Sequence, residues 1–235
     1  MSRIRSAALK AATCEEIKMT ARLIMGREGT ANISMRAIGR SMQITAPALY
    51  HYYPSREALI TDLILDAFTA LGDALELARD NIADQSPVEQ LMTVLLAYRR
   101  WVLVHPIDFQ LIYGNPIPGY QAPAEMTVPA ATRSFIIIAG LIARAISASP
   151  HIPQPEYSRV PEKLVPYIQE LASQIAGTGV CFPELALYLT LVGWPRIHGI
   201  IMLELFHHIQ PVAGDVDLFY QIQLEDMLRS MGLLG

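Results

Sequence analysis

Residues 33–59 read ISMRAIGRSMQITAPALYHYYPSREAL. This stretch predicts two short helices, a tight turn, and the start of a third helix. Ser34, Thr45 and Ser55 stand where these helices begin, and a hydroxyl there accepts a bond from a backbone N–H that has no partner within the helix. Pro47 falls in the first turn of the second helix, where its missing N–H costs nothing.

Two short helices joined by a tight turn form the geometry that places a recognition helix in the major groove of DNA. Here the recognition helix would cover residues 45–52, which carry no net charge. We expect Leu49 to lie in the core. The polar groups available on or around this helix are Thr45, Tyr50, His51, Tyr52, Tyr53, Arg36, Arg40 and Arg56.

The same stretch carries a resemblance to a known family. The pattern SMRxIGRxMxxxxPALYHYYPSREALI closely resembles the DNA-binding domain of the TetR (tetracycline-repressor-like) family of transcriptional regulators, over about the first sixty residues. One position departs from the family pattern, because the turn residue that is usually glycine is Gln43 here. A residue other than glycine at positive φ costs on the order of 1 kcal/mol, so we expect a slightly altered or strained turn.

The resemblance implies which residues touch DNA. The positions that usually touch DNA, mostly its phosphates, are matched by Thr45, Tyr50, His51 and Arg56. Ala46 and Pro47 match positions that usually approach base edges. Apolar residues at base edges can contact thymine methyl groups. The alternative for the tyrosines is packing in the core. The candidate DNA-binding residues are Ser34, Arg36, Arg40, Thr45, Ala46, Pro47, Tyr50, His51 and Arg56.

The charge is divided unevenly along the chain. Residues 1–60 hold nine Lys and Arg against four Asp and Glu, whereas the remaining residues hold nine basic and 18 acidic side chains. A basic front and an acidic remainder suit a protein that binds phosphates at one end only. Arg3, Arg5 and Lys10 form a predicted basic arm, and Thr13 with Glu16 forms a capping-box pattern that predicts a helix beginning there.

The remaining pattern predicts an all-α chain, since helix-forming residues dominate and no hairpin dipeptide separates alternating apolar runs. We expect a helix-turn-helix DNA-binding domain over residues 1–58 and a larger helical ligand-binding and dimerisation domain over residues 59–235. Further helices are predicted at 55–81, 86–104, 107–113, 127–146, 163–176, 182–209 and 218–231, with Pro129 in a first turn and Pro195 kinking its helix.

A second resemblance covers about residues 86–232. Trp194, His198 and Gly199, with the run LIYGNPIPGY at 111–120, resemble the C-terminal domain of a TetR subgroup named for its Trp-His-Gly (WHG) signature. Regulators of this kind bind DNA through two copies of the helix-turn-helix, which predicts a homodimer. The expected interface combines helices 183–208 and 218–231; the alternative is that its residues fill an intramolecular core. The candidates are Leu185, Leu189, Val192, Leu203, Leu205, Leu218 and Ile222.

The family resemblance also implies a cavity for a small, often apolar effector. The alternative is a filled aromatic core. The candidate ligand-binding residues are Tyr98, Trp101, His105, Phe109, Tyr113, Met126, Arg133 and Phe135.

Catalysis has little support, because the sequence lacks a nucleophile elbow, a phosphate loop and a Cys-x-x-Cys pair. We therefore expect no enzyme activity, no cofactor and no metal; Glu204 with His207 and His208 is the only cluster that suggests a metal. Cys14 and Cys181 are expected to be reduced, as in a cytoplasmic protein that does not bind a membrane.

The sequence predicts a DNA-binding transcriptional regulator. We expect a homodimeric repressor that binds a palindromic operator and is released from it by a small-molecule effector. The alternative is a helical small-molecule-binding protein or enzyme with a degenerate DNA-binding head.

Overall fold

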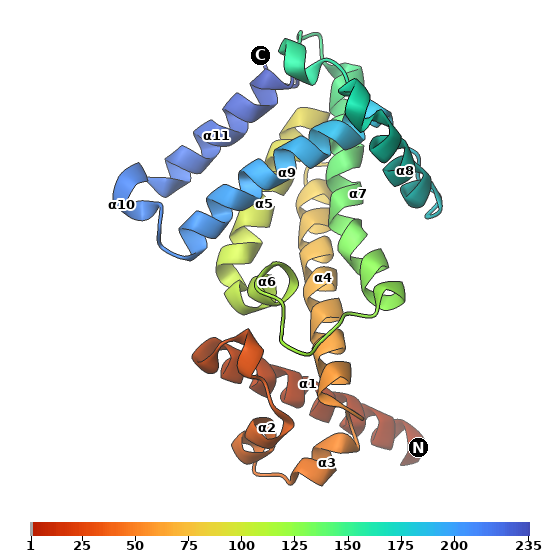
Figure 1. Cartoon of the computed structure of the whole chain (residues 1–235), viewed down its shortest axis with the longest axis vertical. Coiled ribbons are helices and arrows are strands. Elements are labelled where there is room, and N and C mark those ends of the chain that lie inside the picture. Colours follow the sequence, from red (N-terminus) through yellow and green to blue (C-terminus); the bar gives the residue numbers. More distant parts are fainter. Residues whose placement is uncertain (1) are drawn as a thin grey trace. The chain divides into compact units, whose positions relative to one another are not determined.

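The computed structural model describes the backbone of residues 2–235 and the side chains from residue 7 onward, so the side chains of Arg3 and Arg5 lie outside the described part. Every regular element in this part is helical, which confirms the all-α prediction (Figure 1). The longer helices are α1 (Ser2–Glu28), α4 (Arg56–Asp80), α5 (Pro87–Val104), α7 (Ala124–Ala148), α9 (Glu184–Leu205) and α11 (Val216–Ser230). The shorter ones are α2 (Met35–Met42), α3 (Ala46–Tyr50), α6 (Pro106–Tyr113), α8 (Val165–Ala176), α10 (Gln210–Ala213), and the 3-10 helices η1 (Thr30–Asn32), η2 (Pro155–Tyr157) and η3 (Glu162–Leu164).

The chain divides into two compact units. Unit 1 comprises Met1–Ala70 and His105–Ala131, and unit 2 comprises Leu71–Val104 and Thr132–Gly235. The division falls inside α4 and inside α7, so each of these helices contributes residues to both units.

The first helix begins earlier than the capping pattern predicts. α1 already starts at Ser2, and Thr13 lies in its interior, where its hydroxyl donates to the Leu9 carbonyl at 3.0 Å. The prediction of a helix start at Thr13 is therefore wrong. The reason is that residues 7–12 read AALKAA, which are strong helix formers that extend the helix without any need of a cap.

The core of unit 1 joins α1, α2, α3 and α4. It includes Leu49 and Leu59, both fully buried, and Ile117 from the loop after α6. A buried lysine lies beside this core: the Lys18 ammonium of α1 is 2.6 Å from Asp66 and 3.7 Å from Asp62, both on α4, and 2.8 Å from Glu15. The ion pairs provide the charge that a buried ammonium needs, and they tie α1 to α4.

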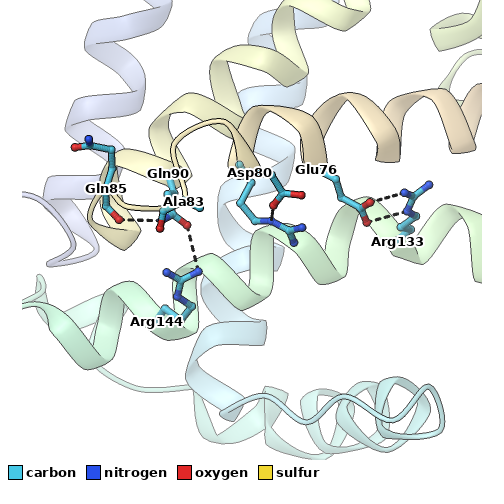
Figure 2. A network of polar contacts seen from close by, with 8 residues as sticks. Glu76, Asp80, Ala83, Gln85, Gln90, Arg133 and Arg144 are labelled. Carbon is cyan, nitrogen blue, oxygen red and sulfur yellow. Dashed lines mark hydrogen bonds and ion pairs between the residues drawn. The ribbon is translucent and has the colours of Figure 1, made fainter.

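Unit 2 is built on α5, α7, α9 and α11, with α8 packed on α9 (Figure 1). The predicted capping box opens α5, since the Glu89 carboxylate accepts the Ser86 N–H at 2.9 Å and the Glu89 N–H donates to the Ser86 hydroxyl at 3.4 Å. Figure 2 shows the next residue, Gln90, whose amide donates to the carbonyls of Ala83 and Gln85. The Gln90 side chain thereby holds the turn between α4 and α5.

Two prolines lie inside long helices. α7 begins at Ala124, so Pro129 is an interior residue and its predicted place in the first turn is wrong. The helix starts earlier because the Pro123 carbonyl accepts the N–H groups of both Met126 and Thr127 at 3.0 Å. α9 continues as one helix through Pro195, and a kink there stays a prediction.

α7 and α9 are also long and apolar enough to cross a membrane, judged by length and composition alone. In their most apolar windows, 39% and 44% of the residues are buried inside the structure. Core helices of globular proteins have the same composition, so these two helices are weak support for a membrane protein.

Candidate nucleic-acid interface and neighbouring sites

The α2–turn–α3 segment has the predicted local geometry. The Ser34 hydroxyl accepts the Ala37 N–H at 3.2 Å, and the Thr45 hydroxyl accepts the Ala48 N–H at 3.4 Å, so both caps are confirmed. The turn is tight, because a Cβ added at Gly39 would lie 2.9 Å from the Ile44 carbonyl oxygen. α3 buries only Leu49, which leaves the remainder of this short helix available to a partner.

An open hollow of about 450 Å³ lies between α2 and α3. Arg36 and Arg40 line it, and neither guanidinium has an ion pair among the described residues. Thr45 and Ala46, both predicted to contact DNA, line the same hollow. Two uncompensated positive charges beside the start of a short helix make this surface suitable for binding phosphate.

The neighbouring tyrosines have different surroundings. Tyr50 is 49% exposed, and its hydroxyl has no hydrogen bond among the described residues, whereas Tyr53 is 6% exposed and donates to Asp62 at 2.6 Å. His51 and Pro47 are exposed, and Tyr52 is half-buried. The structure therefore leaves Tyr50 available for DNA and uses Tyr53 for internal packing.

Arg56 is already engaged within the protein. Its Nε donates to the Ile33 carbonyl at 2.9 Å, and one terminal nitrogen donates to the Ala31 carbonyl at 3.4 Å. These bonds hold the segment that leads into α2. Arg56 thus has a structural role that sequence reasoning missed, and its predicted contact with DNA stays a prediction.

The eight predicted ligand residues are divided between the two units. Phe109, which is fully buried, and Tyr113 pack together in unit 1 with ring centroids 5.5 Å apart. Met126 is 50% exposed and His105 is exposed. Tyr98, Trp101, Arg133 and Phe135 belong to unit 2. The ligand role of all eight stays a prediction.

Arg133, one of the predicted ligand residues, forms ion pairs within unit 2. Its guanidinium lies 2.7 Å from Asp73. It also makes a bidentate contact with the Glu76 carboxylate, at 2.6 and 3.0 Å (Figure 2). Its stem also lies against Gly72, where an added Cβ would be 2.8 Å from the Arg133 Cδ. The arginine thus joins α7 to α4 within unit 2.

Unit 1 contains a cavity that sequence reasoning missed. Its volume is about 380 Å³, and it is lined by apolar side chains of α4, α6 and α7 and by the loop that joins α6 to α7. At its wall the Tyr120 hydroxyl lies 2.9 Å from the Thr61 hydroxyl. The residues that line it include Ile64, Phe68, Leu111, Ile112, Ile117, Tyr120, Thr127, Val128 and Ala131, and none of the eight predicted ligand residues is among them. The turn-rich run at 114–123 was its only signal in the sequence.

The predicted interface residues differ in how much each is exposed. Leu203, Leu218 and Ile222 are 47%, 55% and 49% exposed, and Leu185, Val192 and Leu205 are half-buried. Leu189 is only 1% exposed, so its assignment to an interface is corrected: it packs in the core of unit 2. Leu191 and Phe206, at 38% and 42% exposure, are further apolar side chains on the exposed surface of this helix pair, and the prediction omitted both.

Comparison with known proteins identifies the family. Residues 19–63 match the family described as bacterial regulatory proteins, tetR family, and residues 91–227, more than half of the chain, match Tetracyclin repressor-like, C-terminal domain. The chain belongs to the TetR family.

Two curated relatives share part of this TetR chain. The HTH-type transcriptional regulators Rv1816 of Mycobacterium tuberculosis and Mb1846 of Mycobacterium bovis are each 38% identical over 105 residues. The match covers 45% of this chain and 45% of each relative, so the chain spans less than half the length of the curated relatives it matches.

Solved structures resemble the chain over nearly all of its length. The structure of SCO4313, described as a regulatory protein, has a TM-score of 0.75 and 27% identity, and the match covers 95% of this chain and 98% of that one. A tetR-family regulatory protein from Rhodococcus RHA1 has a TM-score of 0.62 and 16% identity, with 93% and 96% covered. The second likeness concerns the fold alone.

The WHG subgroup within the TetR family stays a prediction, because the matching family description does not name it. Two of its signature residues nevertheless touch: the rings of Trp194 and His198 meet edge to face with centroids 5.3 Å apart. The His198 Nδ1 lies 3.0 Å from the Tyr98 hydroxyl, and burial lowers the pKa of this histidine. Gly199 has open space where a Cβ would be, so packing does not require glycine there.

The cluster of Glu204, His207 and His208 does not form a metal site in the structure. The Glu204 carboxylate is bound by Arg99 through two hydrogen bonds of 2.6 Å. Within the described residues no group of three or more His, Cys, Asp or Glu side chains could hold a metal ion.

Proposed function

We propose that this TetR-family protein is a homodimeric transcriptional repressor that binds a palindromic operator and is released from it by a small-molecule effector. The observation that carries the DNA-binding part is the α2–turn–α3 surface. It combines Tyr50, exposed and without an internal partner, with the unpaired guanidiniums of Arg36 and Arg40. The DNA-binding domain is assigned to residues 1–58 and the ligand-binding and dimerisation domain to residues 59–235.

A homodimer is supported by the exposed apolar side chains of α9 and α11, two helices that lie side by side (Figure 1). An apolar patch shared by two packed helices suits pairing with the same patch of a second copy through a two-fold axis. Two recognition helices related by such an axis would meet half-sites about 34–36 Å apart or at a multiple of that spacing. The operator lies in the cytoplasm, where we place the protein, and neither a membrane nor catalysis is part of the proposal.

DNA binding is tested by titrating the purified protein into labelled duplexes that tile the region upstream of its own gene, with a shuffled duplex as control. We expect one duplex to bind much more tightly than the shuffled control. Raising the salt from 50 to 200 mM should weaken binding by at least about 10³-fold if two copies together neutralise six or more phosphates. Equal affinity for all duplexes, or no binding even at 50 mM salt, would refute the proposal.

The effector site is assigned to the cavity of unit 1. Its volume of about 380 Å³ lies in the range of about 300–1,000 Å³ that small-molecule sites occupy. The lining is mostly apolar, and it includes Tyr120, whose hydroxyl lies 2.9 Å from the Thr61 hydroxyl. A small molecule with an apolar body and one hydrogen-bonding group matches this chemistry.

Phenol and 1-octanol are suitable probes of this cavity, and thermal melting in their presence reports binding. The matched variants are Val128→Trp, which fills the cavity from an exposed position on its rim, and Leu77→Trp, which changes an exposed position outside it. We expect a probe to raise the melting temperature of the wild type and of Leu77→Trp but not of Val128→Trp. If a probe raises the melting temperature of both variants equally, the effector site does not lie in this cavity.

A further inference from the structure

Gln43 occupies an unfavourable position in the turn between α2 and α3. Its backbone is left-handed, with φ 57° and ψ 33°, and its N–H donates to the Arg40 carbonyl at 3.3 Å. Glycine adopts this conformation without steric cost, whereas a residue with a Cβ does not. Most positive-φ positions in the described chain are glycines, and the exceptions are Gln43 and His207.

The side chain of Gln43 does not recover this cost inside the protein. Gln43 is exposed, and its amide has no hydrogen bond among the described residues. The sequence uses glycine at Gly39, four residues earlier, where a Cβ would collide with the Ile44 carbonyl. A strained residue whose exposed side chain has no internal role points to a role outside the chain.

The surroundings of Gln43 indicate the chemistry of that role. Its side chain lines the open hollow that also contains Arg36 and Arg40, next to the Thr45 cap of α3. Both guanidiniums lack ion pairs among the described residues, so an anion that enters the hollow meets two positive charges. A carboxamide beside them adds two N–H donors at no charge.

We propose that Gln43 contacts DNA, with its amide N–H donating to a phosphate oxygen that Arg36 and Arg40 attract into this hollow. The inference rests on the proposed DNA-binding function and deepens it. It also explains why glutamine stands at a backbone position suited to glycine: the strain of the turn is retained for the sake of a contact that glycine cannot make.

The proposal is tested with Gln43→Gly, because stability and affinity should move in opposite directions. Removing the strained Cβ should raise the melting temperature by about 2–4 °C. Loss of one hydrogen bond should weaken operator binding about fivefold. Since the variant is more stable than the wild type, unfolding cannot explain weaker binding. Gln43→Ala should lose the same affinity without the gain in melting temperature, because alanine keeps the strain.

The salt dependence separates the amide from the arginines. A neutral amide releases no counterion, so Gln43→Gly should leave the slope of log affinity against log salt unchanged, while Arg40→Gln should reduce its size by about 0.9 for each copy that binds. His207→Gly is the matched control for strain relief, and it should gain stability with no change in affinity.

Three results would overturn the inference. The first is that Gln43→Gly binds the operator as tightly as the wild type. The second is a salt slope that falls as in Arg40→Gln, which would mean that the effect passes through a displaced arginine. The third is a loss of affinity that varies with the base sequence, which would assign a base edge in place of a phosphate. If the wild type binds no duplex at all, the proposed function itself fails, and that outcome is distinct from these three.

Discussion

The guanidinium of Arg99 on α5 binds the carboxylate of Glu204 on α9 through two parallel hydrogen bonds, each 2.6 Å long. The same guanidinium lies 2.6 Å from Asp217 of α11, and its carbon is 5.0 Å from the ring centroid of Tyr220. Both members of the Arg99–Glu204 pair are largely buried. The Arg99 guanidinium therefore joins α5 to α9 and α11, the two helices that carry the proposed dimer surface.

Arg99→Met should lower the free energy of unfolding by about 3–5 kcal/mol, because it leaves the buried Glu204 carboxylate without a partner. The double variant Arg99→Met with Glu204→Leu should recover much of the loss, since no unpaired charge remains. Urea denaturation followed by circular dichroism measures both. If the double variant is no more stable than the single one, the cost does not come from the stranded carboxylate.

Tyr50→Phe and Tyr53→Phe should have opposite effects, although the residues are three apart. Tyr50→Phe removes an exposed hydroxyl, so we expect weaker operator binding, by about fivefold, and an unchanged melting temperature. Tyr53→Phe removes the bond to Asp62, so we expect a lower melting temperature and unchanged affinity. Thermal melting and a binding titration on the same samples decide; the reverse pattern would contradict the assignment of Tyr50.

Leu203→Glu and Ile222→Glu should each convert the proposed homodimer into a monomer, because each would bury a charge without a partner in the interface. Both residues are about half exposed in the single chain, so folding should be little affected. Leu77→Glu is the matched control at a more exposed leucine of unit 2. Sedimentation at micromolar concentration measures the outcome, and variants that sediment like the wild type would exclude this surface.

Stability should fall at alkaline pH through Lys18 and Tyr53. Burial lowers the pKa of Lys18, but its hydrogen bonds with Asp66 and Glu15 and their charges outweigh burial and raise it overall. Burial and the bond to Asp62 raise the pKa of Tyr53. A folded-state pKa above the unfolded value stabilises the fold fully below the unfolded pKa, about 10 for both groups, and this stabilisation is lost as the pH rises through the folded pKa.

The corresponding measurement is urea denaturation of the wild type between pH 8 and about 11. The free energy of unfolding should decline over the upper part of this interval. Lys18→Met with Tyr53→Phe removes both titrating groups, so the double variant should be less stable at pH 8 and show a smaller decline. A wild-type stability that is constant across the interval would refute this account.

Gln90→Glu should destabilise unit 2 by about 1–3 kcal/mol, because a carboxylate cannot donate to the carbonyls of Ala83 and Gln85. The change keeps the size of the side chain, and it keeps an acceptor for Arg144, which donates to the Gln90 amide oxygen at 3.2 Å. The melting temperatures of the wild type and of Gln90→Glu test this prediction. A melting temperature equal to that of the wild type would mean that these two bonds contribute little.

Helix starts were largely predictable. The caps at Ser34 and Thr45 and the capping box at Ser86 depend on side chains within three residues of the backbone groups they satisfy, so short-range patterns reveal them. The positive φ of Gln43 followed in the same way from its place in the turn. The predicted helix start at Thr13 was wrong, because the strong helix formers that precede it extend α1 toward the N-terminus.

The candidate sites were less predictable. Tyr50 and Tyr53 lie in one short run, yet only the second reaches Asp62, and Leu189 is buried while Leu203 on the same helix is exposed. The ion pairs of Arg133 could not be predicted, because its partners, Asp73 and Glu76, come from a helix some sixty residues earlier. Apart from the turn-rich run at 114–123, the cavity of unit 1 had no pattern in the sequence, because residues of three helices and one loop line it together.

The amino-acid sequence by itself determined the helical class, most helix boundaries and the TetR family, because these depend on local hydrogen bonding and on motifs that are contiguous in the chain. Only the tertiary structure decided which arginines and tyrosines are engaged internally and which remain available to DNA, and which leucines pack in the core. The physical reason is that burial and ion pairing depend on residues that are distant in sequence and become neighbours only when the helices pack.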